Sequence, residues 1–277
     1  MSFIVSVCAK VRNMLECVVN ISEGRRSRVI DSIARAAGAD LLDVHTDADH
    51  NRTVLTLVGE DAPRAIACEA VALLDLRRHT GAHPRIGVVD VVPFIALEGS
   101  SPADAVGARD RFARWVGHEL GVPAFLYGDD GPTLPEVRRG AFASLRPAFG
   151  PGMAHPTAGA VAVGARDVLV AYNIWLAQPD MALARSIASG LRGPSVRALA
   201  MQIGDAVQVS INLVNPRLVG PAAVYDIVAS HAPVARAELV GLVPRVVLDA
   251  IDPARWPDLD LHVDRTIEAR RMAPPTR

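Results

Sequence analysis

Residue types suited to proton transfer are concentrated between positions 77 and 87, in the run Arg-Arg-His-Thr-Gly-Ala-His-Pro-Arg-Ile-Gly. Pro84 restricts the backbone of His83 to extended conformations, so its imidazole is expected on a rigid turn. A fixed histidine with a pKa near neutrality is the usual proton shuttle of enzymes. The alternative is that His79 and His83 are polar turn residues beside a solvated helix end, and the residues alone slightly favour this alternative.

No metal site is predicted for this loop. His79 and His83 are four residues apart, but Gly81 and Pro84 interrupt the helix that would bring both rings to one face. The sequence also lacks GxSxG, GxxxxGK and HExxH motifs, and it has no GxGxxG after a strand. It therefore offers no support for the commonest hydrolase, nucleotide-binding and metalloprotease activities.

A second polar cluster is expected at a hairpin between two strands, and it comprises Asp43, His45, Asp47, Asp49, His50, Asn51, Arg52 and Thr53. Asp and Asn are common in hairpin turns for backbone reasons, so most of these residues are interpreted as turn residues. Asn51 and Arg52 are the better candidates for function. A third cluster, from Asn20 to Gly24, joins a strand to a helix, where backbone N–H groups either face a ligand or cap the helix.

The elements that position these clusters follow from the spacing of apolar residues. In the first half, strands are predicted at 15–20, 41–46, 53–58, 87–97 and 122–127, with helices at 29–37, 65–76 and 102–120. In the second half, strands are predicted at 168–175, 196–201, 207–213 and 237–242, with helices at 181–191 and 222–230. Each half has the βαββαβ order of a ferredoxin-like fold.

The predicted fold class is thus α/β (α+β), with two sandwiches that each have helices on one face of a sheet. The other face of each sheet is left for burial or for lining a groove. Residues 129–159 are rich in Gly and Pro and are predicted to connect the two halves. The tail after Asp252 contains Pro253, Pro257, Pro274 and Pro275 and is expected to be loosely attached.

Composition narrows the classes of partner. The 277 residues carry 29 Lys and Arg against 30 Asp and Glu, and a net charge of -1 gives no long-range field for nucleic acid or an anionic membrane. Neither a signal peptide nor a membrane-spanning segment is predicted. Three cysteines without CxxC spacing indicate no disulfide framework, which fits a reducing cytoplasm. Most basic residues are Arg, which suits carboxylate-bearing substrates, although biased codon use explains the same excess more simply.

Taken together, several stretches resemble the formiminotransferase family, which is found alone in many bacteria and fused to a cyclodeaminase in animals. The matching stretches are 15–24, 51–54, 81–87 with Asp90 and Pro93-Phe94, 125–128, 149–151, 163–166, 171–173, 208–213 and 239–244. Each stretch is weak alone, but their order and spacing across residues 14–244 are specific to this family.

The resemblance implies two ferredoxin-like subdomains with a folate groove between them, at residues 14–163 and 164–252, followed by the tail 253–277. It also implies a homodimer, with tetrahydrofolate as co-substrate. The catalytic histidine of the family falls on His83. The folate-contacting stretch falls on Gly150, Pro151, Gly152, Met153, Ala154, His155, Pro156, Thr157, Ala158 and Gly159.

Two departures from the family pattern concern the substrate pocket. An acidic residue that lies near the active-site histidine in animal members corresponds to His45, although Asp43, Asp47 or Asp49 could serve instead. The segment between Gly128 and Phe149 is also shorter than usual, and Ala148 stands where the family usually has Asp.

The implied reaction moves a formimino group between N-formimino-L-glutamate and tetrahydrofolate, giving 5-formiminotetrahydrofolate and L-glutamate. His83 is expected to take the proton from N5 and to deliver one to the departing amine. Arg52 and Arg85 are expected to bind substrate carboxylates bidentately, with Asn51 and His45 as further substrate-binding residues. Two alternatives stay open: a formimino or formyl transferase that acts on a non-glutamate amine, and a non-catalytic folate-binding protein. A separate cyclodeaminase is a candidate partner.

Overall fold

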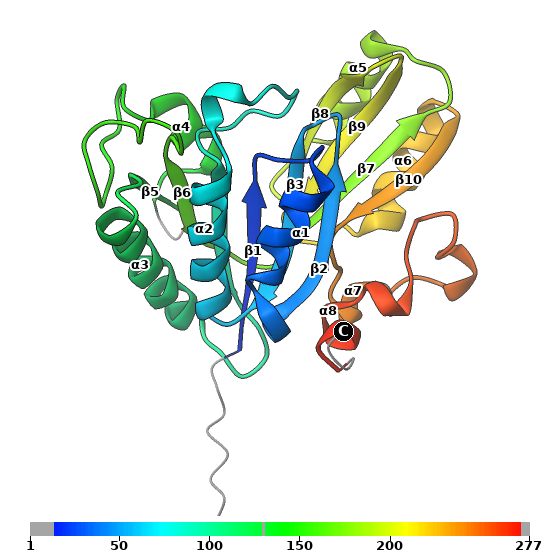
Figure 1. Cartoon of the computed structure of the whole chain (residues 1–277). Helices are drawn as coiled ribbons and strands as arrows, with labels where there is room; N and C mark the ends of the chain where they lie inside the picture. The colour runs from blue at the N-terminus through cyan, green and yellow to red at the C-terminus, as the bar shows by residue number, and fades with distance from the viewer. Residues whose placement is uncertain (1–13, 129–130, 273–277) are drawn as a thin grey trace, which may run out of the picture.

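The first unit of the chain is a ferredoxin-like βαββαβ fold in the computed structural model, which describes residues 14–128 and 131–272 (Figure 1). It contains β1 (Leu15–Ile21), α1 (Ser27–Arg35), β2 (Leu41–Asp47), β3 (Arg52–Val58), α2 (Asp61–Leu73) and β4 (Val89–Ala96). The strands are antiparallel and lie in the order β2-β3-β1-β4. The predicted topology of the first half is therefore confirmed.

Additional elements extend the first sheet at its β4 edge. They are α3 (Pro102–Glu119), β5 (Ala124–Tyr127), α4 (Leu134–Gly140) and β6 (Val161–Ala165). Strand β6 lies between β4 and β5 and is parallel to both. Neither α4 nor β6 was predicted. The reason is local, because β6 is a short run that is buried on both faces without alternation, and α4 has only seven residues.

The second unit repeats the same topology. It contains β7 (Val170–Leu176), α5 (Met181–Leu191), β8 (Val196–Ile203), β9 (Ala206–Leu213), α6 (Pro221–His231) and β10 (Val234–Val240). Its strands are antiparallel and lie in the order β10-β7-β9-β8. The predicted repeat of βαββαβ is therefore confirmed. The predicted boundary between residues 163 and 164 falls inside β6, so a boundary after Ala165 keeps that strand with its own sheet.

Each sheet buries one face beneath its own helices (Figure 1). Ile33 of α1, Ile66 of α2 and Phe112 of α3 belong to the first core, and helices α5 and α6 cover the second. The odd-numbered residues of β1, from Leu15 to Ile21, also belong to the first core. Because side chains alternate along a strand, the even-numbered residues of β1 face the opposite side of the sheet.

The chain after Asp252 packs against both units, in contrast to the loose attachment expected from its prolines. Leu259 is fully buried in the second core, and its carbonyl oxygen accepts a hydrogen bond of 2.7 Å from the Tyr172 hydroxyl. Ile267, at the start of α8 (Ile267–Met272), packs with Leu42 and Leu242. These apolar side chains anchor the segment. Pro274 and Pro275 lie outside the described residues.

Within residues 14–128 and 131–272, no helix has both the length and the apolar character needed to cross a membrane.

Candidate active site

A cavity of about 780 Å³ lies between the two sheets, on the faces that their helices leave uncovered. The first sheet contributes Glu16, Val18 and Asn20 from β1, and the second contributes Asn173 from β7 and Asn212 from β9. This volume is in the range of pockets that bind drug-sized ligands. We call this cavity the interunit pocket.

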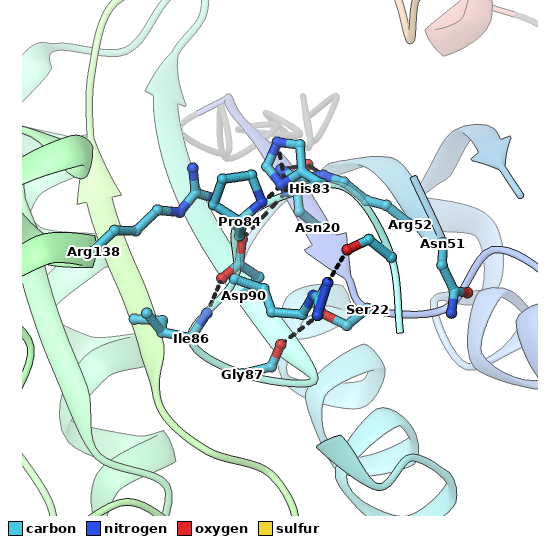
Figure 2. A network of polar contacts seen from close by, with 12 residues as sticks. Asn20, Ser22, Asn51, Arg52, His83, Pro84, Ile86, Gly87, Asp90 and Arg138 are labelled. Atoms are coloured by element: carbon cyan, nitrogen blue, oxygen red, sulfur yellow. Dashed lines mark hydrogen bonds and ion pairs between the residues drawn. The ribbon is translucent and has the colours of Figure 1, made fainter. Parts of the chain in front are cut away.

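His83 stands at the wall of the interunit pocket, in contact with an arginine (Figure 2). One terminal nitrogen of Arg52, Nη1, lies 2.6 Å from Nδ1 and 3.2 Å from Nε2 of the imidazole. Nδ1 also lies 2.7 Å from the carbonyl oxygen of Pro84. The nitrogen either accepts from Arg52 or donates to Pro84, because one imidazole nitrogen cannot do both.

The buried carboxylate of Asp90, on β4, organises the charges around His83 (Figure 2). Its Oδ2 lies 3.3 Å from Nη1 of Arg52 and 2.5 Å from Nη2 of Arg138. Its Oδ1 accepts a hydrogen bond of 2.7 Å from the backbone N–H of Ile86, in the loop that carries His83. Asp90 thus ties two arginines and the histidine loop to one strand.

Arg52 is further held by β1. The Oδ1 of Asn20 accepts hydrogen bonds from Nε of Arg52 at 3.1 Å and from Nη2 at 2.6 Å. Burial lowers the pKa of Arg52 to about 10, and the nearby Asp90 opposes this fall, so the guanidinium keeps its charge at neutral pH. The fixed guanidinium therefore acts as a permanent positive charge beside His83.

Burial and this charge together set the protonation state of His83. Burial lowers the pKa of the imidazole, and the positive charges of Arg52 and Arg138 lower it further, to about 2. The ring is therefore neutral at physiological pH and can accept a proton. A carboxylate bound beside the two arginines would offset their charge and raise the pKa of His83.

His45, on β2, lies in the interunit pocket, and its Nε2 is 3.5 Å from Oε1 of Glu238 on β10. Asp47, His50 and Arg52 of the predicted second cluster also line the pocket. Oδ2 of Asp47 lies 2.5 Å from Nδ1 of His50. The ring of His50 meets that of His83 edge to face, with 6.2 Å between the centroids. The hairpin and the histidine loop, predicted as separate clusters, therefore meet.

Asn51 and Arg85 do not line the interunit pocket. The Oδ1 of Asn51 accepts from the Gly24 backbone N–H at 2.8 Å, and its Nδ2 donates to the Thr80 carbonyl at 2.8 Å. Arg85 donates from Nη2 to the carbonyl oxygen of Gly81. Both side chains hold loops together, and their predicted contact with substrate stays a prediction.

The family model described as the formiminotransferase domain, N-terminal subdomain, matches residues 14–166 of the chain. The chain belongs to the formiminotransferase family. The resemblance given by the sequence motifs is therefore confirmed.

Three relatives illustrate the similarity. The glutamate formimidoyltransferase of Streptococcus pyogenes serotype M1 is 34% identical, over 90% of this chain and 96% of the relative. The glutamate formimidoyltransferase of Thermoplasma acidophilum is 35% identical, over 88% and 92%. The formimidoyltransferase-cyclodeaminase of Sus scrofa is 36% identical, over 86% of this chain but only 51% of the relative.

The stretch that the formiminotransferase resemblance assigns to folate, residues 150–159, lies outside the interunit pocket. It supports the histidine loop from behind, because the carbonyl oxygen of Thr157 accepts from the Leu76 N–H at 2.7 Å and that of Ala158 accepts from the Val88 N–H at 2.9 Å. Met153 is 79% exposed. A contact between this stretch and folate stays a prediction.

Arg138 and Glu238 were not predicted as site residues of this formiminotransferase, and Asp90 was predicted only as part of a stretch that matches the family. A local signal for α4, which carries Arg138, was present. The carboxylate of Glu136 accepts from both the N–H and the hydroxyl of Thr133, at 2.7 Å each, which is the capping pair expected of a Thr-x-x-Glu sequence. In the residues that the structure describes, no group of three or more His, Cys, Asp or Glu side chains is arranged to hold a metal ion.

Proposed function

We propose that this protein is a glutamate formimidoyltransferase that moves the formimino group from N-formimino-L-glutamate to N5 of tetrahydrofolate in the interunit pocket. The observation that carries the proposal is the neutral His83 beside Arg52 and Arg138 at the wall of a large pocket, in a chain of the formiminotransferase family. The protein is thus an enzyme of one-carbon transfer, with tetrahydrofolate as the acceptor substrate.

The arginines suit the donor. N-Formimino-L-glutamate carries two carboxylates, and guanidinium groups bind carboxylates through paired, charge-assisted hydrogen bonds. Arg52 and Arg138 share Asp90 and both line the pocket, so the carboxylates of the donor have two fixed partners close to His83. We assign donor binding to this pair. Arg138 adds a candidate to the arginines that the sequence suggested, Arg52 and Arg85, because it lines the pocket.

Proton transfer follows from the state of His83. A bond forms between N5 and the amidine carbon of the donor, and the tetrahedral intermediate carries one proton too many on N5. His83 takes that proton, because it is neutral, and returns it to the glutamate nitrogen as the bond between that nitrogen and the carbon breaks. The donor carboxylates at Arg52 and Arg138 raise the basicity of His83 only when the substrate is in place.

The family supports a wider proposal for the cellular setting. A homodimer in the cytoplasm, with a separate cyclodeaminase to consume the 5-formiminotetrahydrofolate, fits the stand-alone relatives from Streptococcus and Thermoplasma. Sedimentation of the purified protein tests the dimer.

The test of the function is an absorbance assay for acid-convertible methenyltetrahydrofolate, with N-formimino-L-glutamate and tetrahydrofolate as substrates. We expect turnover in the wild type and a loss of about 10²- to 10⁴-fold in His83→Ala. His231→Ala is the matched control, because His231 is exposed and outside the interunit pocket. An unchanged kcat in His83→Ala would exclude the assigned role.

A second donor class is favoured by one observation. His45 places an imidazole in the pocket where animal members have an acidic residue, and Glu238 holds it there. Formiminoglycine and formiminoaspartate, assayed beside formiminoglutamate, separate a transferase for another amine from the main proposal. Folate binding without turnover of any donor would point to a non-catalytic folate-binding protein.

A further inference from the structure

Glu16 is a buried carboxyl group inside the interunit pocket. It is the second residue of β1, and its neighbours Leu15 and Cys17 point into the first core while Glu16 points to the pocket. Its exposed fraction is only 4%. Glu16 is therefore an ionisable side chain at a buried position where an apolar side chain would serve packing equally well.

No residue in the described part of the chain donates a hydrogen bond to this carboxyl group. Among charged side chains, Arg166 favours the carboxylate form of Glu16 and Glu268 disfavours it. Nη1 of Arg166 donates instead to the carbonyl oxygen of Asp167 at 2.8 Å. Burial is the largest influence and raises the pKa of Glu16 to about 7. A buried polar group without a partner costs stability, so its oxygens are available to a ligand.

The surroundings of Glu16 suit a flat ring. Val18, Pro93 and Leu242 line the same pocket. Val58, the β3 residue paired with Glu16, packs against a small cluster that contains Leu242. Apolar walls with a few polar groups are typical of sites for small molecules.

Strand β1 also relates Glu16 to the reacting end of the pocket. Asn20, on the same face, is four residues further along, and it holds Arg52 beside His83. At a rise of about 3.3 Å per residue, the Cα atoms of Glu16 and Asn20 are about 13 Å apart. A bicyclic ring anchored at Glu16 would therefore present its far ring toward His83.

We propose that Glu16 binds the pterin ring of tetrahydrofolate by accepting two parallel hydrogen bonds from its N3–H and its 2-amino group. This inference rests on the proposed function and adds a residue that orients the acceptor. A carboxylate offers two acceptors side by side, and this edge of the pterin offers two donors side by side. N5 lies on the other ring, away from this edge, and therefore faces the His83 end.

The test compares two folates on two proteins. Dissociation constants of (6S)-5-formyltetrahydrofolate and of its analogue without the 2-amino group are measured by calorimetry on the full chain. We expect the wild type to prefer the 2-amino compound by about tenfold to a hundredfold, which is the scale of hydrogen bonds to a charged group. Glu16→Gln should lose this preference. The glutamine amide has an NH2 group in place of one carboxylate oxygen, so one hydrogen-bond donor of the protein would face a hydrogen-bond donor of the pterin.

Glu98→Gln serves as the matched control, because Glu98 is exposed and outside the pocket. An equal preference in wild type and Glu16→Gln would overturn the inference, as would equal losses for both folates. A raised KM for the formimino donor with unchanged folate affinity would assign Glu16 to the amidinium of the donor and would also overturn it. If the wild type binds neither folate, the proposed function itself fails.

A second readout separates binding from packing. Hydrogen-bond donors of the pterin favour the ionised form of Glu16. Because Glu16 is partly protonated near neutral pH, it must release a proton when folate binds. Calorimetry in two buffers of different ionisation enthalpy should detect proton release near pH 7 in the wild type and less release in Glu16→Gln. Equal proton release in the two proteins would contradict the assignment, even if Glu16→Gln had lost affinity through a packing defect.

Discussion

Nε2 of His45 lies 3.5 Å from Oε1 of Glu238, and this contact joins the two ferredoxin-like units across the interunit pocket. His45 is on β2 of the first unit and Glu238 on β10 of the second. The second unit holds the carboxylate in place, because Oε2 of Glu238 accepts from Nε1 of Trp175 at 3.0 Å and from Nδ2 of Asn173 at 3.2 Å. The pair therefore holds the imidazole of His45 in the interunit pocket that His83 also lines.

We predict that Glu238→Gln makes stability less sensitive to acid. Burial raises the pKa of Glu238, but hydrogen bonds from His45, Trp175 and Asn173 outweigh it and lower the pKa from 4.5 to about 2. A lowered carboxyl pKa stabilises the fold above pH 4.5, and this stabilisation is lost as the pH falls toward 2. Urea unfolding at pH 7 should therefore show a loss of about 1 kcal/mol in the variant, shrinking at pH 3. Glu98→Gln is the control, and a loss that is equal at both pH values would contradict the prediction.

Asp90→Asn should damage both stability and turnover. Asp90 is the shared partner of Arg52 and Arg138, and removing its charge leaves two guanidinium groups close together. Breaking a buried ion pair in this way costs about 3–5 kcal/mol. The measurements are urea unfolding and the methenyltetrahydrofolate assay. Asp31→Asn, on the exposed side of α1, controls for a change of one charge. A variant that is as stable as the wild type would show that Asp90 does not hold the arginines.

Arg138→Gln should weaken the binding of the formimino donor and leave the binding of the folate acceptor unchanged. The guanidinium is expected to bind a carboxylate of N-formimino-L-glutamate, so its loss should raise the KM for this donor by at least about tenfold, which corresponds to one charged hydrogen bond. The affinity for 5-formyltetrahydrofolate should change less than twofold. Arg146→Gln, which alters an exposed arginine outside the interunit pocket, is the matched control. A reduced folate affinity with an unchanged KM for the formimino donor would instead assign Arg138 to folate binding.

His83 should show no protonation step between pH 5 and 8 in the protein without substrates. Burial and the two arginine charges lower its pKa from 6.5 to about 2, so the folded protein keeps the ring neutral while the unfolded chain protonates near pH 6.5. His83 therefore lowers stability as the pH falls below 6.5. The imidazole chemical shifts of labelled protein report this directly, and urea-unfolded protein gives the reference. A midpoint for His83 within this pH range would refute the neutral state, and Arg138→Gln should raise the pKa.

Much of the fold follows from local signals. The alternation of apolar residues predicts the strands of both units, and the βαββαβ order in each half predicts two ferredoxin-like sheets, as observed. Pro84 and the surrounding glycines mark the loop of His83 as a candidate site. One glycine has a visible reason, because a Cβ at Gly81 would collide with the carbonyl oxygen of His50. Such features are encoded within a few residues, so they can be recognised without a structure.

Which residues belong to the candidate site depends on contacts between residues that are distant in the sequence. Arg138 meets Asp90 from 48 positions away, and His45 meets Glu238 from the other unit. Asn51 is the opposite case, because its amide is engaged by two loops and does not line the pocket. Strand alternation shows that Glu16 and Leu15 face opposite sides of a sheet, but only the packing of the second unit encloses the side of Glu16 as a pocket. The sequence by itself determined the repeated topology and the candidate histidine loop, because periodicity and turn chemistry are local. Only the tertiary structure decided which charges surround that histidine, because long-range packing sets the distances between charged side chains.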